Sequence, residues 1–156
     1  MVQADEIARI VALHGNRRGA LLPVLHDVQA ALGCIPDDAV PEIAHGLNLT
    51  RADVHGVITF YHDFRCVPPA RHVVKLCRAE ACQALGGAAI EAAAARALGV
   101  AMGGARADGQ VALEAVYCLG MCATGPNALV DGRPVSRLDA SRVEAIAAEL
   151  ETEVAS

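Results

Sequence analysis

The chain has 156 residues, enough for one ordinary domain or for a small domain with a helical extension. Its hydrophobic fraction of 54% is rich in alanine and only 3% of its residues are aromatic, so the core must be built mostly from Leu, Val, Ile and Ala. The formal net charge is −5, and no basic run exceeds Arg17-Arg18, so no phosphate-binding stripe is visible and no nucleic acid partner is expected.

No apolar stretch reaches the roughly 20 residues of a membrane span, and the N-terminus lacks the basic and apolar regions of a secretion signal. We therefore expect a soluble, cytoplasmic protein without direct membrane insertion. The cytosol keeps thiols reduced, so a cysteine-rich pattern there favours metal binding or catalysis over disulfides.

The N-terminal part is predicted to form four short amphipathic helices, because its apolar residues recur at helical spacing. Thr50-x-x-Asp53 has the pattern of a capping box at the start of the fourth helix. Pro68 and Pro69 forbid a continuing helix and indicate a linker. We therefore expect an N-terminal four-helix segment at 1–67 and a second domain at 68–156.

The second domain is predicted to alternate between strands and helices. Its expected elements are a strand at 72–77, a helix at 83–98, a glycine-rich loop at 99–109, strands at 111–117 and 128–130, a hairpin turn at Asp131-Gly132, a short strand at Val135, and a C-terminal helix capped by Asp139 or Ser141. This order is that of a thioredoxin-like domain. The predicted fold class is therefore α/β, with an N-terminal helical bundle followed by a thioredoxin-like domain.

Four cysteines form two pairs, Cys77-x4-Cys82 and Cys118-x3-Cys122, and each pair lies where a predicted strand runs into a loop. A helix between the first two strands implies a parallel crossover, which brings the carboxyl ends of both strands to the same edge of the sheet. The two pairs can therefore converge there and bind one metal centre.

Four thiolates without a histidine suit either structural zinc or a 2Fe-2S cluster. Zinc pairs are usually spaced Cys-x2-Cys, so the wider spacing here favours the cluster. A zinc-stabilised binding module is the alternative of a different class. A thiol oxidoreductase is a weaker third reading, because no Cys-x-x-Cys motif occurs.

The residues next to the cysteines suit a metal site whose reduction potential is set by its surroundings. Gly120 would let backbone N–H groups approach the sulfurs, while Leu119 and Met121 would either shield the sulfurs from water or simply pack. Arg78 could offset negative charge at the site.

The remaining cysteines, Cys34 and Cys66, have no partner at ligand spacing and are predicted to be buried or half-buried free thiols. The six histidines lack metal-binding spacing, and no nucleotide-binding or nucleophile motif occurs. No catalytic residue is therefore expected on this chain.

Together, Cys-x4-Cys, the run Cys118-Leu-Gly-x-Cys-x3-Pro126, Leu22-Pro-Val-Leu-His-Asp-Val-Gln29 and Thr59-Phe-Tyr-x-x-Phe64 resemble the 24-kDa subunit family of NADH dehydrogenase (complex I). The resemblance covers nearly the whole chain and implies a thioredoxin-like fold with one 2Fe-2S cluster. By the same resemblance, the cluster ligands are Cys77, Cys82, Cys118 and Cys122.

Within that family, Gly56 to Phe64 and Lys75 to Cys82 look most like the gamma subunit of soluble NAD-dependent formate dehydrogenases. This closer resemblance implies an electron-transfer subunit that works beside an FMN- and NAD-binding flavoprotein and a molybdenum-containing catalytic subunit. The FMN, NAD and molybdenum cofactor would then lie on those partners, and the N-terminal helices would help the chain to dock. An equivalent subunit of complex I, or of the diaphorase unit of an NAD-linked hydrogenase, is the alternative.

Overall fold

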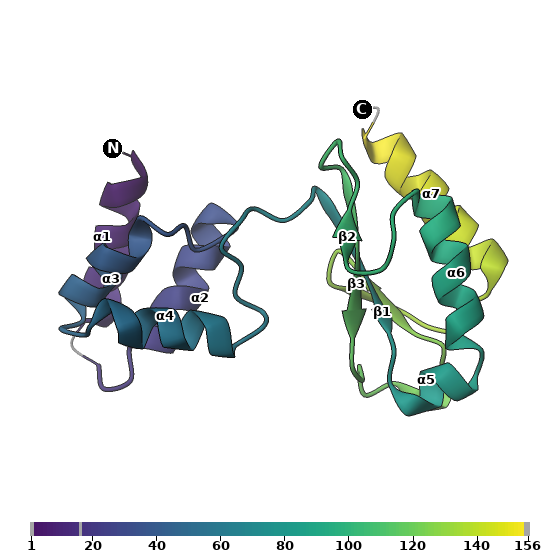
Figure 1. Ribbon diagram of the computed structural model, residues 1–156, viewed down its shortest axis with the longest axis horizontal. Helices are drawn as coiled ribbons and strands as arrows, with labels where there is room; N and C mark the ends of the chain where they lie inside the picture. Colours follow the sequence, from purple (N-terminus) through teal and green to yellow (C-terminus); the bar gives the residue numbers. More distant parts are fainter. Residues whose placement is uncertain (1, 16, 155–156) are drawn as a thin grey trace. The chain divides into compact units, whose positions relative to one another are not determined.

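A computed structural model describes residues 2–15 and 17–154. The chain forms two compact units, residues 1–69 and residues 70–156, which are called the helical unit and the sheet unit below. Figure 1 shows that helices alone make up the first, whereas a sheet with helices packed against it makes up the second. None of the described helices is both long enough and apolar enough to cross a membrane.

The helical unit consists of the four helices that the apolar spacing predicts. They are α1 (Val2–His14), α2 (Leu21–Leu32), α3 (Ala39–Gly46) and α4 (Arg51–Phe60). Each contributes apolar residues to a single core, in which Leu25, Ile43 and Val54 are fully buried. The amphipathic pattern therefore produces this unit directly, because each helix must bury its apolar stripe against the others.

The capping box predicted at the start of α4 is confirmed. The backbone N–H of Asp53 donates to Thr50 Oγ1 at 3.1 Å, and the backbone N–H of Thr50 donates to Asp53 Oδ2 at 3.0 Å. The pKa of the Asp53 carboxyl is lowered, first by the hydrogen bond from the Thr50 hydroxyl and then by that backbone bond. Two N–H groups that the helix itself cannot pair are thus satisfied locally.

The sheet unit contains a mixed sheet in the strand order β2-β3-β1-β4-β5. Its strands are β1 (His72–Cys77), β2 (Gly104–Ala105), β3 (Val111–Val116), β4 (Ala128–Val130) and β5 (Arg133–Val135). Strands β1 and β3 are parallel, with Cys77 opposite Val116, whereas the other pairings are antiparallel. The expected parallel crossover is therefore confirmed.

Two details of the predicted element order are wrong. The expected helix at 83–98 is divided into α5 (Glu80–Ala84) and α6 (Gly87–Leu98), because Gly86 adopts a left-handed φ of 94° that a continuous helix cannot contain. The expected loop at 99–109 contains the short strand β2, which extends the sheet beside β3. Two residues are too few for an alternating pattern to be recognised in a sequence.

The core of the sheet unit lies between the sheet and the helices α6 and α7 (Ala140–Val154), which pack side by side against one of its faces (Figure 1). Leu113 on β3 and Leu150 on α7 are almost completely inaccessible to solvent. Asp139 caps α7, since its Oδ1 accepts the backbone N–H of Arg142 at 2.7 Å. Of the two predicted caps, Asp139 is therefore the correct one.

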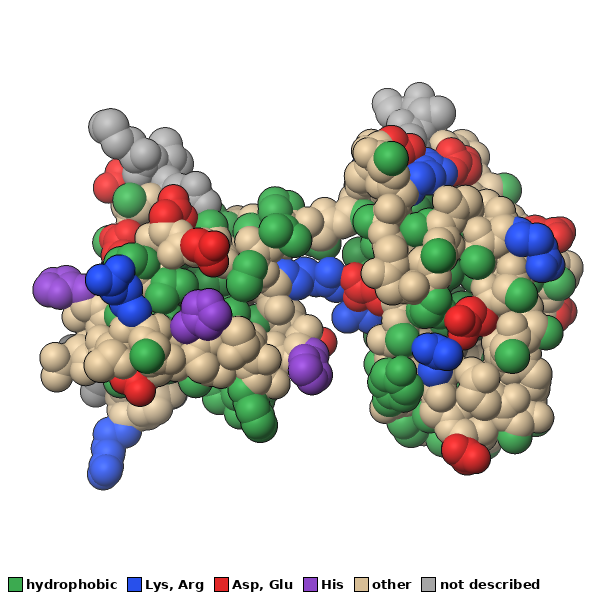
Figure 2. All heavy atoms as spheres, viewed as in Figure 1, with side chains coloured by type: hydrophobic (Ala, Val, Ile, Leu, Met, Phe, Trp, Pro, Cys, Tyr) green, Lys and Arg blue, Asp and Glu red, His purple; other side chains and the backbone are tan. Residues whose placement is uncertain are grey.

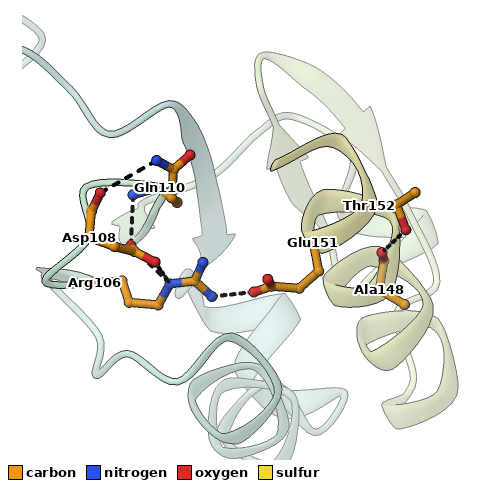
Figure 3. A network of polar contacts seen from close by, with 6 residues as sticks. All are labelled: Arg106, Asp108, Gln110, Ala148, Glu151 and Thr152. Atoms are coloured by element: carbon orange, nitrogen blue, oxygen red, sulfur yellow. Dashed lines mark hydrogen bonds and ion pairs between the residues drawn. The ribbon is translucent and has the colours of Figure 1, made fainter. Parts of the chain in front are cut away.

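A surface network ties the turn between β2 and β3 to the last turns of α7 (Figure 3). Arg106 donates to both carboxylate oxygens of Asp108 and also pairs with Glu151. The Asp108 and Glu151 carboxylates, in that order, raise the pKa of the Arg106 guanidinium. The network therefore joins the β2–β3 turn to α7 at the end of the sheet unit opposite α5 (Figure 1).

The hairpin turn between β4 and β5 is also confirmed. Asp131 and Gly132 both have positive φ, 49° and 78°, as a tight two-residue turn requires. The Asp131 carboxylate accepts the backbone N–H of Val73 at 2.8 Å and contacts Nδ1 of the buried His72 at 2.9 Å. The turn is thereby joined to the start of β1.

Candidate metal centre

The sheet brings both cysteine pairs to one edge. Cys77 ends β1, and Cys118 follows two residues after the end of β3, the parallel neighbour of β1. Cys82 lies in α5, directly after β1, and Cys122 opens a short 3-10 helix that leads toward β4. The convergence that strand order predicts is therefore present in the structure.

The first pair is buried. The thiols of Cys77 and Cys82 belong to residues that are 6% and 1% exposed. Burial by itself raises the pKa of Cys77, but hydrogen bonds from the Ala79 amide, from the Cys82 thiol and from the second loop outweigh it and lower that pKa. A lower pKa favours the thiolate form of Cys77, which is the form that binds metal.

The second loop reaches the first pair through its backbone. The main-chain N–H groups of Cys118 and Leu119 lie close enough to the Cys77 sulfur to lower the pKa of its thiol. Cys118 has a left-handed φ of 74°, which for a residue with a side chain costs on the order of 1–3 kcal/mol. Nothing in the sequence signals this conformation.

The second pair is exposed to solvent. The sulfurs of Cys118 and Cys122 lie 3.8 Å apart, and the N–H of Gly120 donates to the Cys118 sulfur at 3.4 Å. The pKa of Cys122 is raised by its hydrogen bond with Cys118, by the charge of Cys118 and by a smaller effect of Cys77. Only the effect of Cys77 joins the two pairs, because Cys118 and Cys122 belong to the same pair. The predicted role of Gly120 is confirmed.

Asn127 is a site residue that the sequence did not reveal. It is 2% exposed, and its side-chain amide donates to the Cys82 sulfur at 3.7 Å and to the Met121 carbonyl at 2.7 Å. The main-chain carbonyl of Asn127 accepts the backbone N–H of Cys77 at 3.0 Å. Burial and then Cys77 raise the pKa of Cys82, while the Asn127 N–H groups oppose this increase. The sequence offers one weak signal for it, a polar residue between Pro126 and the apolar run 128–130.

The Arg78 guanidinium pairs with Glu91 on α6 at 3.0 Å, and its effect on the charge at the site stays a prediction. Leu119 and Met121 are half-buried, which suits both shielding and simple packing. Cys34 is a buried free thiol, as predicted, whereas Cys66 is exposed, contrary to the prediction. Cys66 lies in the segment that follows α4, where no apolar layer covers it.

The edge around the second pair carries exposed apolar side chains. On the face in Figure 2, hydrophobic side chains reach the surface at the lower end of the sheet unit, the end at which α5 lies in Figure 1. Leu85 after α5 is 55% exposed, and Tyr117 beside Cys118 is 70% exposed. Elsewhere on that face acidic and basic side chains are interspersed.

The sulfurs occur as two pairs and not as one compact set. Within residues 2–15 and 17–154, no group of three or more Cys, His, Asp or Glu side chains is gathered as for a single metal ion.

The family of thioredoxin-like 2Fe-2S ferredoxins matches this chain over residues 7–151. The E subunit of NADH-quinone oxidoreductase from Escherichia coli K12 is 37% identical over 114 residues, which are 73% of this chain and 69% of the relative. The E 2 subunit of the same enzyme from Rhizobium meliloti is 32% identical and covers 94% of this chain and 87% of the relative. These matches include both units.

This chain is also similar to parts of two hydrogenases. The NADP-reducing hydrogenase subunit HndA of Solidesulfovibrio fructosivorans is 26% identical over 92% of this chain and 84% of its own length. Among solved structures, the air-oxidised NAD+-reducing NiFe-hydrogenase superposes with a TM-score of 0.75 at 27% identity. That match covers 86% of this chain but only 23% of the hydrogenase chain, so the similarity concerns one part of a much larger protein.

The residues at the sheet edge fit a 2Fe-2S cluster. Such a cluster takes four cysteine thiolates, two for each of its irons, and two close pairs of sulfurs lie here. The backbone and side-chain N–H groups that point at Cys77, Cys82 and Cys118 suit sulfurs that carry negative charge.

Proposed function

Because this chain belongs to the thioredoxin-like 2Fe-2S ferredoxin family and carries a 2Fe-2S cluster, we propose that it is a non-catalytic electron-transfer subunit of an NAD-linked oxidoreductase complex. The bound cluster supplies one-electron transfer. The chain itself holds the cluster, directs N–H donors at its sulfurs and presents it at one edge. No bond-making chemistry is assigned to its residues.

The proposed ligands are Cys77, Cys82, Cys118 and Cys122. The observation that carries this assignment is the parallel register of β1 and β3, which places Cys77 opposite Val116 and thus brings the first pair to the edge where the Cys118 and Cys122 sulfurs lie 3.8 Å apart. Two of the sulfurs are buried and two are exposed. The protein thus anchors one side of the cluster in its interior and leaves the other side open to an electron-transfer partner.

We further propose that this partner is an FMN- and NAD-binding flavoprotein, which contacts the edge that exposes Leu85 and Tyr117. Apolar side chains around an exposed redox site would allow close approach and would exclude water when the partner binds. Support comes from the relatives, which are subunits of an NADH-quinone oxidoreductase and of a hydrogenase.

The same relatives favour a complex I type or an NAD-linked hydrogenase type of assembly over the formate dehydrogenase that the sequence motifs predict. Formate as the electron donor, together with a molybdenum-containing subunit, stays a prediction based on the resemblance of the segments Gly56 to Phe64 and Lys75 to Cys82.

The ligand assignment is tested by four single Cys→Ser variants of the chain purified without oxygen. Each is expected to lose the visible absorption and the EPR signal of the reduced cluster, whereas Cys34→Ser and Cys66→Ser retain both. Iron, sulfide and zinc are measured on the same samples. Stoichiometric zinc without sulfide would overturn the cluster, and a full cluster in Cys118→Ser would overturn the ligand set.

The partner is tested by purifying the tagged chain from its native host without oxygen. A flavoprotein that contains FMN should co-purify, and Tyr117→Asp should weaken that association without loss of the cluster signal. Reduction of NAD by the purified complex is then assayed with formate and with hydrogen, and its NADH oxidation with a quinone. A chain that purifies alone would overturn the proposed partner, and formate-dependent activity with bound molybdenum would decide for formate dehydrogenase.

A further inference from the structure

Asn127 links the two halves of the metal centre. Asn127 precedes β4, and its main-chain carbonyl accepts the backbone N–H of Cys77. Its side-chain amide donates to the Cys82 sulfur and to the Met121 carbonyl in the second loop. A single residue thus holds both of the segments that carry the cysteine pairs.

The orientation of the Asn127 amide is determined by its neighbours. Its Oδ1 lies 3.4 Å from Thr124 Oγ1, and that hydroxyl also lies 3.1 Å from the Met121 carbonyl and 3.2 Å from Ser136 Oγ. The Met121 carbonyl can only accept, so the amide nitrogen must face it and the Cys82 sulfur. A reversed amide would bring two acceptors together at 2.7 Å in a buried site, which is unfavourable.

We propose that Asn127 is a positioning residue that raises the reduction potential of the cluster by directing its side-chain N–H at the Cys82 sulfur. This inference deepens the proposed function and rests on Cys82 being a ligand.

The physical reason is that reduction adds one negative charge to the cluster, and part of that charge resides on the ligand sulfurs. A hydrogen-bond donor stabilises the reduced form more than the oxidised form, so the donor favours reduction. Cys82 is 1% exposed, so water cannot replace the lost donor and the surrounding dielectric screens little of the effect. At the exposed Cys118 and Cys122, by contrast, water can substitute.

The test uses the variants Asn127→Leu and Asn127→Asp in the full chain, with potentials obtained from EPR-monitored redox titration. Leucine keeps the side-chain size but removes the donor, and the equilibrium constant for reduction should fall about tenfold, which is about 59 mV for one electron. Aspartate should lower it further, because it adds a negative charge beside the sulfur.

Ser136→Ala is the matched control, because Ser136 joins the same network through Thr124 but contacts no sulfur. Its potential should equal that of the wild type. An Asn127→Leu protein with an intact cluster spectrum and an unchanged potential would overturn the proposal, and so would an equal shift in Ser136→Ala.

A second measurement applies to the wild-type protein and does not depend on whether the variants bind the cluster. Asparagine labelled with 15N only in its side-chain amide is incorporated, and pulsed EPR of the reduced protein should detect coupling to that nitrogen. The control is Asn48→Gly, which removes a labelled side chain from the helical unit and should leave the coupling unchanged. Glycine is chosen because Asn48 has a φ of 53°, which glycine tolerates.

Absence of any 15N coupling would overturn the inference. A Cys82→Ser protein that keeps the cluster would instead overturn the ligand set. The two failures are therefore distinguishable.

Discussion

The two units achieve order in different ways. In the helical unit, local signals agree with the tertiary packing: apolar stripes, a capping box and a fully buried core of aliphatic side chains around Leu25 and Ile43. The sheet unit has a comparable core around Leu113, but at one edge it contains a strained Cys118, a buried amide and two exposed thiols. This edge therefore combines a strained backbone, a buried polar side chain and exposed thiols at the place where chemistry is expected.

This difference predicts that bound iron stabilises the sheet unit and not the helical unit. Removal of iron with a chelator under reducing conditions should increase backbone hydrogen exchange in segments 77–85 and 117–127 and leave helices α1 to α4 unchanged. The free energy of unfolding of the sheet unit should fall by about 4 kcal/mol, because a tightly bound cluster stabilises only the folded state. Equal loss of protection in both units would contradict this difference between them.

Cavities made in the two cores should act separately. Leu25→Ala in the helical unit and Leu113→Ala in the sheet unit each remove a fully buried side chain, and each should lower the free energy of unfolding of its own unit by about 2–5 kcal/mol. Segment-resolved hydrogen exchange in urea distinguishes the units. Only Leu113→Ala should also reduce cluster occupancy, and loss of the cluster in Leu25→Ala would show that the units are coupled.

A smaller effect is expected at the start of α4. Thr50→Ala removes the cap that accepts the Asp53 N–H and should cost about 1 kcal/mol in the helical unit. Thr59→Ala is the control, because the Thr59 hydroxyl only bonds to carbonyls of the preceding turn of α4. Urea unfolding of both variants provides the measurement. A cost in Thr59→Ala as large as in Thr50→Ala would contradict the capping role.

The smallest effect is expected at the surface network of Figure 3. Arg106→Gln should lower the melting temperature of the sheet unit slightly, because exposed ion pairs contribute little. The difference from wild type should shrink as NaCl is raised to about 1 M, where charges are screened within about 3 Å. Arg9→Gln, which breaks an exposed pair with Glu6 in the helical unit, serves as the control and should leave the sheet unit unchanged.

Much of the fold could be predicted because it depends on local patterns. Helical spacing, the Thr50 cap and the Asp131-Gly132 turn are all encoded within a few neighbouring residues. The break between α5 and α6 lies at Gly86-Gly87, a dipeptide typical of turns, and it was missed because the alanine-rich residues around it have high helix propensity.

The sequence by itself determined the number of cysteine pairs, their position after two parallel strands and hence their convergence at one edge, because the direction of a crossover follows from the element order. Only the tertiary structure decided which pair is buried, that the backbone of Cys118 lies near the Cys77 sulfur with a left-handed φ, and that Asn127, which precedes β4, reaches Cys82 in α5. These contacts join residues that are 41 to 45 positions apart, and their hydrogen bonds depend on distances and angles that spacing along a chain does not specify.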